Sequence, residues 1–337
     1  MAVRTLIVDD SPTMRALIAG TLRRDPDIEV VGAADGPLQA REMIKALDPD
    51  VITLDVEMPD MNGLDFLERI MRLRPMPVVM LSTLTQAGAD VTIRALELGA
   101  VECCAKPAQG CVDRHLVDSV KAAALSRRVR ISDAAHAPVP ASPFQPRANA
   151  LIAIGASTGG VEALIAVLGG FPANCPPTVI VQHMPATFTT SFAARLDRLS
   201  KPTVAEARHG QPLLPGHVYL APGGTHHLEV GGTDGQYRAR LIPDDPTSGH
   251  RPSVDRLFRS VAKVAGKHAV GAILTGMGRD GADGLLAMRA QGSFTVGQDR
   301  ESCVVYGMPG VAQEIGAVTR QLTLGRIAPA LIDRCRA

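Results

Sequence analysis

A serine between two glycines is the residue of this sequence best placed to act as a nucleophile. Ser157 lies in the segment GASTG at 155–159, which follows the apolar run Leu151–Ile154 and precedes a helical pattern. A serine on such a strand-to-helix turn leaves little to block an electrophile, and it sits beside the N–H groups that open the helix. The segment therefore predicts a nucleophilic serine, with the N–H of Thr158 as a donor to an oxyanion.

A histidine and an aspartate follow two further apolar runs. His183 comes directly after the predicted strand in VIVQHMP, and Asp280 lies in ILTGMGRDGADG, after Ile273 and Leu274. Because the carboxyl ends of parallel strands meet at one edge of a sheet, Ser157, His183 and Asp280 can converge there as nucleophile, base and orienting group. The backbone N–H of Met277, in the glycine-rich loop, is a second candidate oxyanion donor.

Each of these residues also has a simpler structural interpretation. Ser157 can be a helix N-cap, His183 a hydrogen-bonded loop histidine, and Asp280 the cap of a helix that begins at Gly281. The glycines of 155–160 can instead cradle a dinucleotide phosphate, although Ser157 occupies the place of the second glycine of that motif. The order Ser, His, Asp also differs from the Ser, Asp, His order of α/β-hydrolases.

A second group of reactive side chains lies in the first 125 residues. Asp9 and Asp10 follow one apolar run, and Asp55 follows another. Carboxylates that converge need a cationic partner, and a divalent cation such as Mg²⁺ suits a few carboxylates plus waters. Ser82 and Lys106 follow later runs and can reach the same pocket. The simpler alternative is that the acids cap helices or lie solvated in loops.

These residues require parallel sheets to position them. Short apolar runs alternate with helical patterns and predict strands at 6–8, 30–33, 51–54, 78–81 and 101–105, with helices between them and a last helix from about 112 to 130. Five such repeats are typical of a doubly wound α/β domain, whose ligands bind at the carboxyl ends of the strands.

The second half repeats this alternation after a change of composition. Four prolines interrupt the Ala- and Ser-rich stretch 132–148, which is typical of a linker. Strands are predicted at 151–154, 178–181 and 270–275, and the segment 217–242 predicts strands and a hairpin that turns at 231–235. We therefore expect a second, mainly parallel, Rossmann-like domain with a β-hairpin. The predicted division is 1–125, a linker at 126–149, and 150–337.

Composition excludes several classes of protein. The chain has 337 residues, a net charge of +1, 3% aromatic residues and no tryptophan, which disfavours binding to nucleic acids. No apolar run is long enough to cross a bilayer, and the first residues do not form a signal peptide. No two of the six cysteines have C-x-x-C spacing, so reduced thiols and a cytoplasmic protein are expected.

The first part resembles the receiver domain of two-component response regulators. The resemblance rests on Asp9-Asp10, on LDVEMPDMNG at 54–63, on Ser82-Thr83 and on Lys106-Pro107. It implies that Asp55 accepts a phosphoryl group from a histidine kinase, whose oxygens Ser82 and Lys106 contact. It also implies a Mg²⁺ site made by Asp10, Asp55 and the carbonyl of Glu57, with Asp9 behind them, and a cis Lys106–Pro107 bond. Receivers often carry an aromatic switch residue at the position of Cys103.

The second part is similar to the chemotaxis methylesterase family. The similarity rests on GASTGG, QHMP and GMGRDGADG, with further support from HRPSVDRLFRSVA at 250–262 and PGGTHHLEV at 222–230. It implies a phosphorylation-regulated hydrolase in which Ser157, His183 and Asp280 cleave glutamyl methyl esters, and glutamine amides, of chemoreceptors through an acyl-enzyme. The esterase chemistry is expected to need no cofactor.

The resemblance also implies partners and control. The substrate would be a methyl-accepting chemoreceptor, the phosphodonor a chemotaxis histidine kinase, and the location the cytoplasm, with recruitment to membrane receptor arrays. We expect the first domain to restrict access to the second until Asp55 is phosphorylated. Two alternatives are a phosphorylation switch with a DNA- or protein-binding second half, and an amidase that acts on another substrate. Helix-turn-helix modules are smaller than residues 150–337, which disfavours the DNA-binding alternative.

Overall fold

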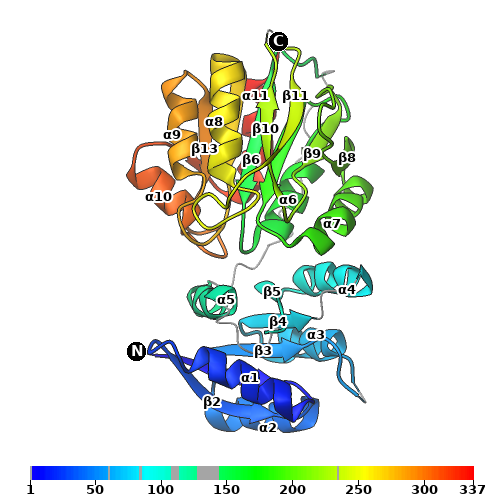
Figure 1. Cartoon of the computed structure of the whole chain (residues 1–337), viewed down its shortest axis with the longest axis vertical. Coiled ribbons are helices and arrows are strands. Elements are labelled where there is room, and N and C mark those ends of the chain that lie inside the picture. The colour runs from blue at the N-terminus through cyan, green and yellow to red at the C-terminus, as the bar shows by residue number, and fades with distance from the viewer. Residues whose placement is uncertain (1, 60, 83–85, 108–113, 127–143, 234) are drawn as a thin grey trace. The chain divides into compact units, whose positions relative to one another are not determined.

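The computed structural model describes residues 2–59, 61–82, 86–107, 114–126, 144–233 and 235–337. The chain divides into two compact units, Met1–Arg128 and Val129–Ala337, and Figure 1 shows the elements of each. Each unit is built on a sheet, and the two are described separately.

The first unit is a five-stranded parallel sheet in the order β2-β1-β3-β4-β5, with helices between the strands. This is the doubly wound arrangement expected from the alternating apolar runs. Its strands are β1 (Val3–Val8), β2 (Ile28–Ala34), β3 (Val51–Asp55), β4 (Val78–Ser82) and β5 (Glu102–Ala105), and its helices are α1 (Pro12–Leu22), α2 (Pro37–Leu47), α3 (Gly63–Leu73), α4 (Gln86–Glu97) and α5 (Arg114–Leu125).

The central strands of this sheet are apolar on both faces. Every residue of β3 and β4 is buried, because helices cover both sides of a parallel sheet. Val8 is in register with Leu54, so the next residues along the two strands, Asp9 and Asp55, come side by side. The predicted strands were placed correctly, but several ends were one to three residues short, and the last predicted strand began one residue early.

The second unit contains a seven-stranded parallel sheet in the order β14-β13-β12-β6-β7-β9-β8. Its strands are β6 (Leu151–Ala156), β7 (Thr178–Gln182), β8 (Thr203–Glu206), β9 (His217–Leu220), β12 (Ala269–Ile273), β13 (Phe294–Gln298) and β14 (Arg320–Leu322). Its helices are α6 (Gly160–Gly169), α7 (Ala186–Leu199), α8 (Val254–Ala265), α9 (Ala282–Ala290), α10 (Met308–Glu314) and α11 (Leu324–Arg334).

The helices of this unit form two groups. Helix α6 contacts α7 and α11, whereas α9 contacts α8 and α10 (Figure 1). Helix α8 also packs on β6 and on the hairpin, and its Leu257, Phe258 and Val261 are fully buried. The start of α8 is thereby held near the ends of the central strands.

The predicted hairpin is a separate two-stranded antiparallel sheet. It consists of β10 (His226–Gly231) and β11 (Arg238–Pro243), with His227 opposite Ile242. The preceding strand β9 pairs instead with β7 and β8 in the large sheet. The hairpin buries Leu228 and Val230 in the core that α8 also fills.

The ends of the second unit lie against each other. The amide of Arg147 donates to the carbonyl of Cys335, and Pro146 forms a bridge with Arg336. Phe144 is buried. The described end of the predicted linker, 144–149, is therefore packed on the unit that follows, while most of the linker lies outside the described residues.

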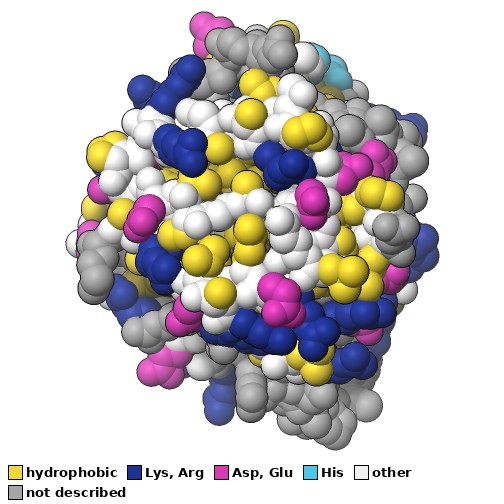
Figure 2. Space-filling model, turned by 90° about the horizontal axis from the view of Figure 1, so that it is seen from below, with side chains coloured by type: hydrophobic (Ala, Val, Ile, Leu, Met, Phe, Trp, Pro, Cys, Tyr) yellow, Lys and Arg dark blue, Asp and Glu magenta, His cyan; other side chains and the backbone are white. Residues whose placement is uncertain are grey.

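The described surface matches the balanced composition. On the face drawn in Figure 2, Lys and Arg side chains lie among acidic and apolar ones. None of the helices in the described part of the chain has both the length and the apolar character needed to span a bilayer.

Candidate active site and phosphoacceptor site

The three residues predicted to act together in the second unit follow three neighbouring strands. Ser157 comes after β6, His183 after β7 and Asp280 after β12, and the sheet places β6 between the other two. Ala156 is in register with Gln182, so Ser157 and His183 are the next residues of adjacent strands. The site therefore lies at the carboxyl edge of the sheet, where helices leave towards opposite faces.

His183 is hydrogen-bonded to Asp280. Its Nε2 lies 2.8 Å from Oδ2 of Asp280, and the Asp280 side chain is 1% exposed. Because an ionised carboxylate only accepts, Nε2 carries the proton of the neutral imidazole. The other ring nitrogen, Nδ1, is buried and has no hydrogen-bond partner among the described residues. That nitrogen is therefore free to accept a proton.

Three further donors surround the Asp280 carboxylate. Ser253 Oγ lies 2.8 Å from Oδ1, the Val254 amide 2.7 Å from Oδ2, and the Asp255 amide 3.1 Å from Oδ1. Burial opposes ionisation, but the donors of His183, Ser253 and Asp255 outweigh it and hold the pKa of Asp280 below its usual value. Asp280 is thus prepared as a carboxylate that orients His183.

The helix-cap interpretations of Ser157 and Asp280 do not hold in the structure. The N-cap of α6 is Gly159, at φ 75°, and no side chain caps that helix, so Ser157 is not its N-cap. The N-cap of α9 is Gly281, again without a side-chain cap, so Asp280 does not cap α9. Its carboxylate instead receives the first N–H groups of α8, a helix that begins elsewhere in the chain.

Glycines allow the start of α8 to come this close. A Cβ at Gly155 would lie 2.1 Å from Cγ1 of Val254, and one at Gly281 would lie 2.5 Å from the same atom. Val254, the first residue of α8, therefore sits between the serine turn and the aspartate turn. The first glycine of the G-x-S-x-G segment thus makes room for packing.

Gln182 links the two turns that carry serine and histidine. Its Nε2 donates to the carbonyl of Ser157 at 2.9 Å and to the carbonyl of His183 at 3.1 Å, and the residue is 2% exposed. The sequence analysis did not identify Gln182, although a glutamine directly after an apolar run is a signal that could have drawn attention to it.

The predicted oxyanion donors flank the serine. The amide of Ser157 itself donates to the carbonyl of Thr275, so it is not available. The carbonyl of Thr158 accepts from Oγ1 of Thr275, which holds the Thr158–Gly159 peptide of the serine turn. Within the described residues, the amides of Thr158 and Met277 donate to no protein carbonyl, so both can serve an incoming oxygen.

A second histidine covers the imidazole of His183. The rings of His183 and His250 are stacked, with centroids 3.8 Å apart and planes 5° from parallel. His250 is the first residue of the segment HRPSVDRLFRSVA, which supports the family resemblance. In the structure it shields one face of the proposed base.

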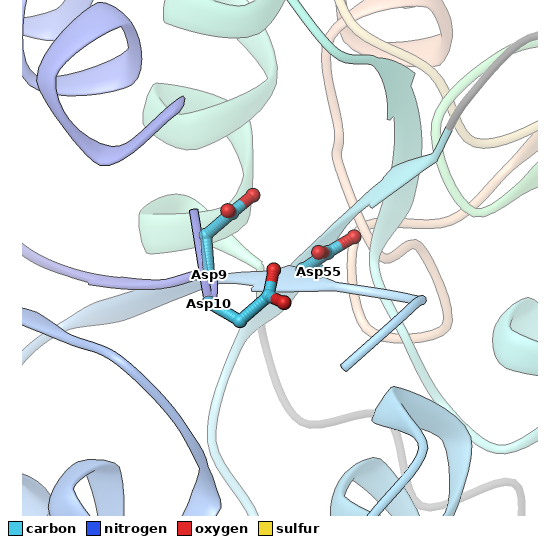
Figure 3. A group of neighbouring side chains, drawn as sticks. All are labelled: Asp9, Asp10 and Asp55. Atoms are coloured by element: carbon cyan, nitrogen blue, oxygen red, sulfur yellow. The ribbon is translucent and has the colours of Figure 1, made fainter. Parts of the chain in front are cut away.

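The three acids of the first unit converge as predicted. Asp9 and Asp10 follow β1 and Asp55 ends β3, and one oxygen of each lies within 4.8 Å of the others (Figure 3). Asp9 and Asp55 are buried, whereas Asp10 is exposed. The amide of Ser11, the N-cap of α1, donates to Asp9, so that acid also helps to cap the helix.

Lys106 faces the two buried acids. Its Nζ lies 2.8 Å from Oδ2 of Asp55 and 3.2 Å from Oδ2 of Asp9. Burial, with the added charge of Asp9, raises the pKa of Asp55 although Lys106 and the Glu57 amide act against it. Burial alone would lower the pKa of Lys106, but the two carboxylates raise it. The pocket therefore holds more negative charge than Lys106 balances.

The other predicted members of the site lie at its rim or within it. Ser82 ends β4 and is buried, while Glu57 is exposed and donates its amide to Oδ1 of Asp55. A cleft of about 640 Å³ opens here, lined by Asp10, Val56, Glu57, Met58, Pro59, Asn62, Val91 and Lys106. Carboxylates and a nearby carbonyl are the oxygen donors that Mg²⁺ binds, so the residues fit that ion.

Two further predictions for this site concern the Lys106–Pro107 peptide bond and the residue at the switch position, Cys103. The described residues contain a cis bond at Arg251–Pro252 and not at Lys106–Pro107, so the prediction of a cis bond there was wrong. The trans form is the one that an X-Pro bond favours without other constraints. Cys103, at the position of the usual aromatic switch, is buried with its thiol 3.6 Å from the Thr92 carbonyl.

Comparisons with known proteins agree over both units. Residues 152–331 match the model of the CheB methylesterase family, and residues 5–118 match that of the response regulator receiver domain. A protein-glutamate methylesterase/protein-glutamine glutaminase of Caulobacter vibrioides is 59% identical, with 99% of this chain and 98% of that protein aligned. One from Agrobacterium fabrum is 57% identical, covering 98% and 95%.

A solved structure resembles the second unit. The crystal structure of the catalytic domain of Thermotoga maritima CheB methylesterase has a TM-score of 0.53 and is 38% identical, covering 55% of this chain and 97% of that one. The similarity therefore extends from sequence to fold in the unit that holds Ser157, His183 and Asp280.

Proposed function

The chain belongs to the CheB methylesterase family, and from this premise we propose that Ser157, His183 and Asp280 hydrolyse its substrate through an acyl-enzyme. The enzyme is a protein-glutamate methylesterase and protein-glutamine glutaminase, and it acts in chemotaxis. We assign residues 1–125 to the receiver domain, 126–149 to the linker and 150–337 to the catalytic domain. The observation that carries the triad is the His183–Asp280 hydrogen bond, which leaves the buried Nδ1 of His183 without a hydrogen-bond partner among the described residues.

The proton moves through Nδ1 of His183. As Oγ of Ser157 attacks the γ-carbonyl of a glutamyl methyl ester, Nδ1 takes its proton while Nε2 keeps its own on the side of Asp280. The imidazolium that forms is stabilised by the carboxylate of Asp280. The stacked ring of His250 limits the access of water to one face of this imidazolium.

Backbone amides stabilise the developing oxyanion. The amides of Thr158 and Met277 are the proposed donors. Removing one donor of this kind typically lowers kcat by about 10²–10³. Methanol leaves with the proton of His183, and water then attacks the acyl-serine to release glutamate. A glutamine amide reacts by the same steps and releases ammonia.

The receiver site regulates this activity. We assign Asp55 as the acceptor of a phosphoryl group, with Lys106 and Ser82 contacting its oxygens. Lys106 already lies 2.8 Å from Asp55, which supports its role. Asp9, Asp10, Asp55 and the carbonyl of Glu57 would hold Mg²⁺, which neutralises carboxylate and phosphoryl charge when bound.

The partners follow from this assignment. Methyl-accepting chemoreceptors are the substrate and a chemotaxis histidine kinase is the phosphodonor. The protein works in the cytoplasm and reaches receptor arrays through these partners. Phosphorylation of Asp55 raises the esterase rate by relieving a restriction that the receiver domain imposes, and a tenfold rise requires about 1.4 kcal/mol.

The test is methanol release from membranes that contain methylated chemoreceptors. Wild type is compared with Ser157→Ala and with Asp55→Asn, each with and without acetyl phosphate and Mg²⁺. We expect release that depends on Ser157 and rises with the phosphodonor in wild type but not in Asp55→Asn. An active Ser157→Ala would refute the nucleophile, and an unstimulated wild type would refute the regulation.

A further inference from the structure

The triad aspartate is bound to the first turn of a helix that the proposed mechanism does not use. Helix α8 begins at Val254, and its N-cap is Ser253. The hydroxyl of Ser253 and the first two N–H groups of α8 all donate to Asp280. A carboxylate at a helix N-terminus is favoured by these N–H groups and by the helix dipole.

We propose that Ser253 is a positioning residue for catalysis, which fixes the Asp280 carboxylate against His183, and that His227 of the β10–β11 hairpin fixes Ser253. This proposal rests on the triad assignment of the preceding section. It gives a role to a serine and a histidine that the sequence analysis quoted without one.

The hydroxyl proton of Ser253 has one direction to take. Ser253 is fully buried, and its Oγ lies 2.8 Å from Oδ1 of Asp280 and 3.4 Å from the amide nitrogen of Arg256. The amide can only donate and the carboxylate can only accept. The single hydroxyl proton therefore points at Asp280, which gives a charge-assisted hydrogen bond in a buried setting.

His227 holds the backbone of Ser253. The residue is fully buried, and its Nδ1 accepts from the Ser253 amide at 3.2 Å. Nε2 then carries the ring proton and donates to the carbonyl of Asp245 at 2.9 Å. Both ring nitrogens are used, so the imidazole is held at both ends. A chain of contacts runs from the hairpin through Ser253 and Asp280 to His183.

The two carboxylate oxygens of Asp280 accept hydrogen bonds from different donors. Oδ2 receives His183 and the Val254 amide, whereas Oδ1 receives Ser253 and the Asp255 amide. Without the Ser253 hydroxyl, Oδ1 keeps one donor and the carboxylate can rotate away from the imidazole. The titratable groups that face Asp280 are His183 and the buried carboxyl of Asp255, so the lost donor acts directly on the histidine–aspartate pair.

The test measures kcat, KM and the pH profile of the full-length enzyme on methylated chemoreceptor membranes. We expect Ser253→Ala to lower kcat about 10- to 100-fold through the lost charge-assisted bond, with KM unchanged, because the change acts on the transition state. The acid limb, where the base His183 is lost to protonation, should move, because Ser253 no longer donates to the carboxylate that is hydrogen-bonded to the imidazole. Ser253→Thr, which keeps the hydroxyl, should restore most of the rate.

A serine on the same helix provides the control. Ser260 accepts from the Val230 amide of the hairpin and does not contact Asp280. Ser260→Ala therefore removes a contact between α8 and the hairpin, as a purely structural change would, and should leave the acid limb in place. If Ser253→Ala melts below the assay temperature, Ser253→Cys keeps the shape with a weaker donor and should shift the profile in the same direction.

The hairpin residue is tested by a double-mutant cycle. His227→Phe should lower kcat less than Ser253→Ala, and the two effects should not add, because His227 acts through Ser253. Additive effects would overturn the role of His227. An unchanged kcat and acid limb in Ser253→Ala, with Ser157→Ala inactive, would overturn this inference while the triad stands. An active Ser157→Ala would instead refute the triad itself.

Discussion

Each of the two sites of this protein lies at the carboxyl ends of the strands of its own parallel sheet. The two sites balance buried charge in different ways. At the triad, Asp280 receives four donors from within its own unit. At the phosphoacceptor site, one lysine faces both Asp9 and Asp55, and Asp10 remains exposed beside an open cleft.

This difference matches the two kinds of chemistry that we propose for the two sites. A hydrolytic site gains rate when its dipoles are already in place, because nothing has to reorganise as charge develops. A site that binds a metal ion and a phosphoryl group binds the ion more tightly when the protein's own cations do not fully neutralise the charge of its carboxylates. A parallel sheet therefore carries a fully hydrogen-bonded carboxylate in one unit and a cluster of carboxylates with unbalanced charge in the other.

The largest expected effect tests the hydrogen-bonded network around the Asp280 carboxylate. Asp280→Asn should lower kcat about 10⁴-fold, because an amide cannot accept from all four donors and His183 loses the tautomer that leaves Nδ1 free. Ester hydrolysis of the full-length variant measures this. Asp283→Asn, on the exposed side of α9 and paired with Arg279, should keep normal activity. A loss below tenfold in Asp280→Asn would show that the network is not required.

The next prediction concerns the packing that brings α8 to the site. Gly155→Ala places a Cβ 2.1 Å from Val254 and should destabilise the catalytic unit by about 1–3 kcal/mol. Gly20→Ala, on an exposed position of α1 with no atom within 4 Å of the new Cβ, should stabilise the receiver unit by about 0.5–1 kcal/mol. Calorimetry of the full chain measures both. Equal shifts would contradict the difference in packing.

A smaller effect is expected at the link between the serine and histidine turns. Gln182→Leu removes two donors from the carbonyls of Ser157 and His183 and should lower kcat about tenfold, as expected for about 1.4 kcal/mol of transition-state energy. Gln182→Glu should lose more, because a carboxylate would face two carbonyl oxygens. The assay is ester hydrolysis at saturating substrate. If Gln182→Leu loses more activity than Gln182→Glu, the side-chain amide of Gln182 does not act as the donor.

An effect of similar size tests the phosphoacceptor site. Mg²⁺ at tenfold its Kd should stabilise the receiver unit by about 1.4 kcal/mol at pH 7–8, measured as the shift of its melting transition against EDTA. Because the folded pKa of Asp55 is raised, the stability from its protonated form is present in acid and is lost as pH rises through that pKa. The Mg²⁺ effect should therefore grow over the same range. It should vanish in Asp55→Asn, and an equal effect at acidic pH would contradict this account.

The positions of the sites could be predicted because both depend on strand ends. An apolar run followed by Asp, Ser or His specifies where that residue emerges, and parallel strands bring such residues to one edge. Asp9, Asp10 and Asp55 were predicted to converge on that basis, and they do. The hairpin was also predicted, since its alternation and glycine turn are local signals.

The supporting residues could not be predicted in the same way. Ser253 lies 27 positions from Asp280, and its role depends on how the first turn of α8 docks between two glycines. His227 depends in turn on the placement of Ser253. Ser253 is the N-cap of α8, a role that depends on its near neighbours in the sequence. Its second partner comes from tertiary packing that no short pattern encodes.

The position of Val254 between Gly155 and Gly281 has a consequence for how the enzyme assembles. The serine turn, the start of α8 and the aspartate turn are far apart in sequence. The site therefore exists only after contacts between distant parts of the chain have formed. During refolding, recovery of secondary structure should therefore precede recovery of hydrolysis. A newly synthesised chain would therefore be inactive until β12 and the aspartate turn that follows it have joined the sheet.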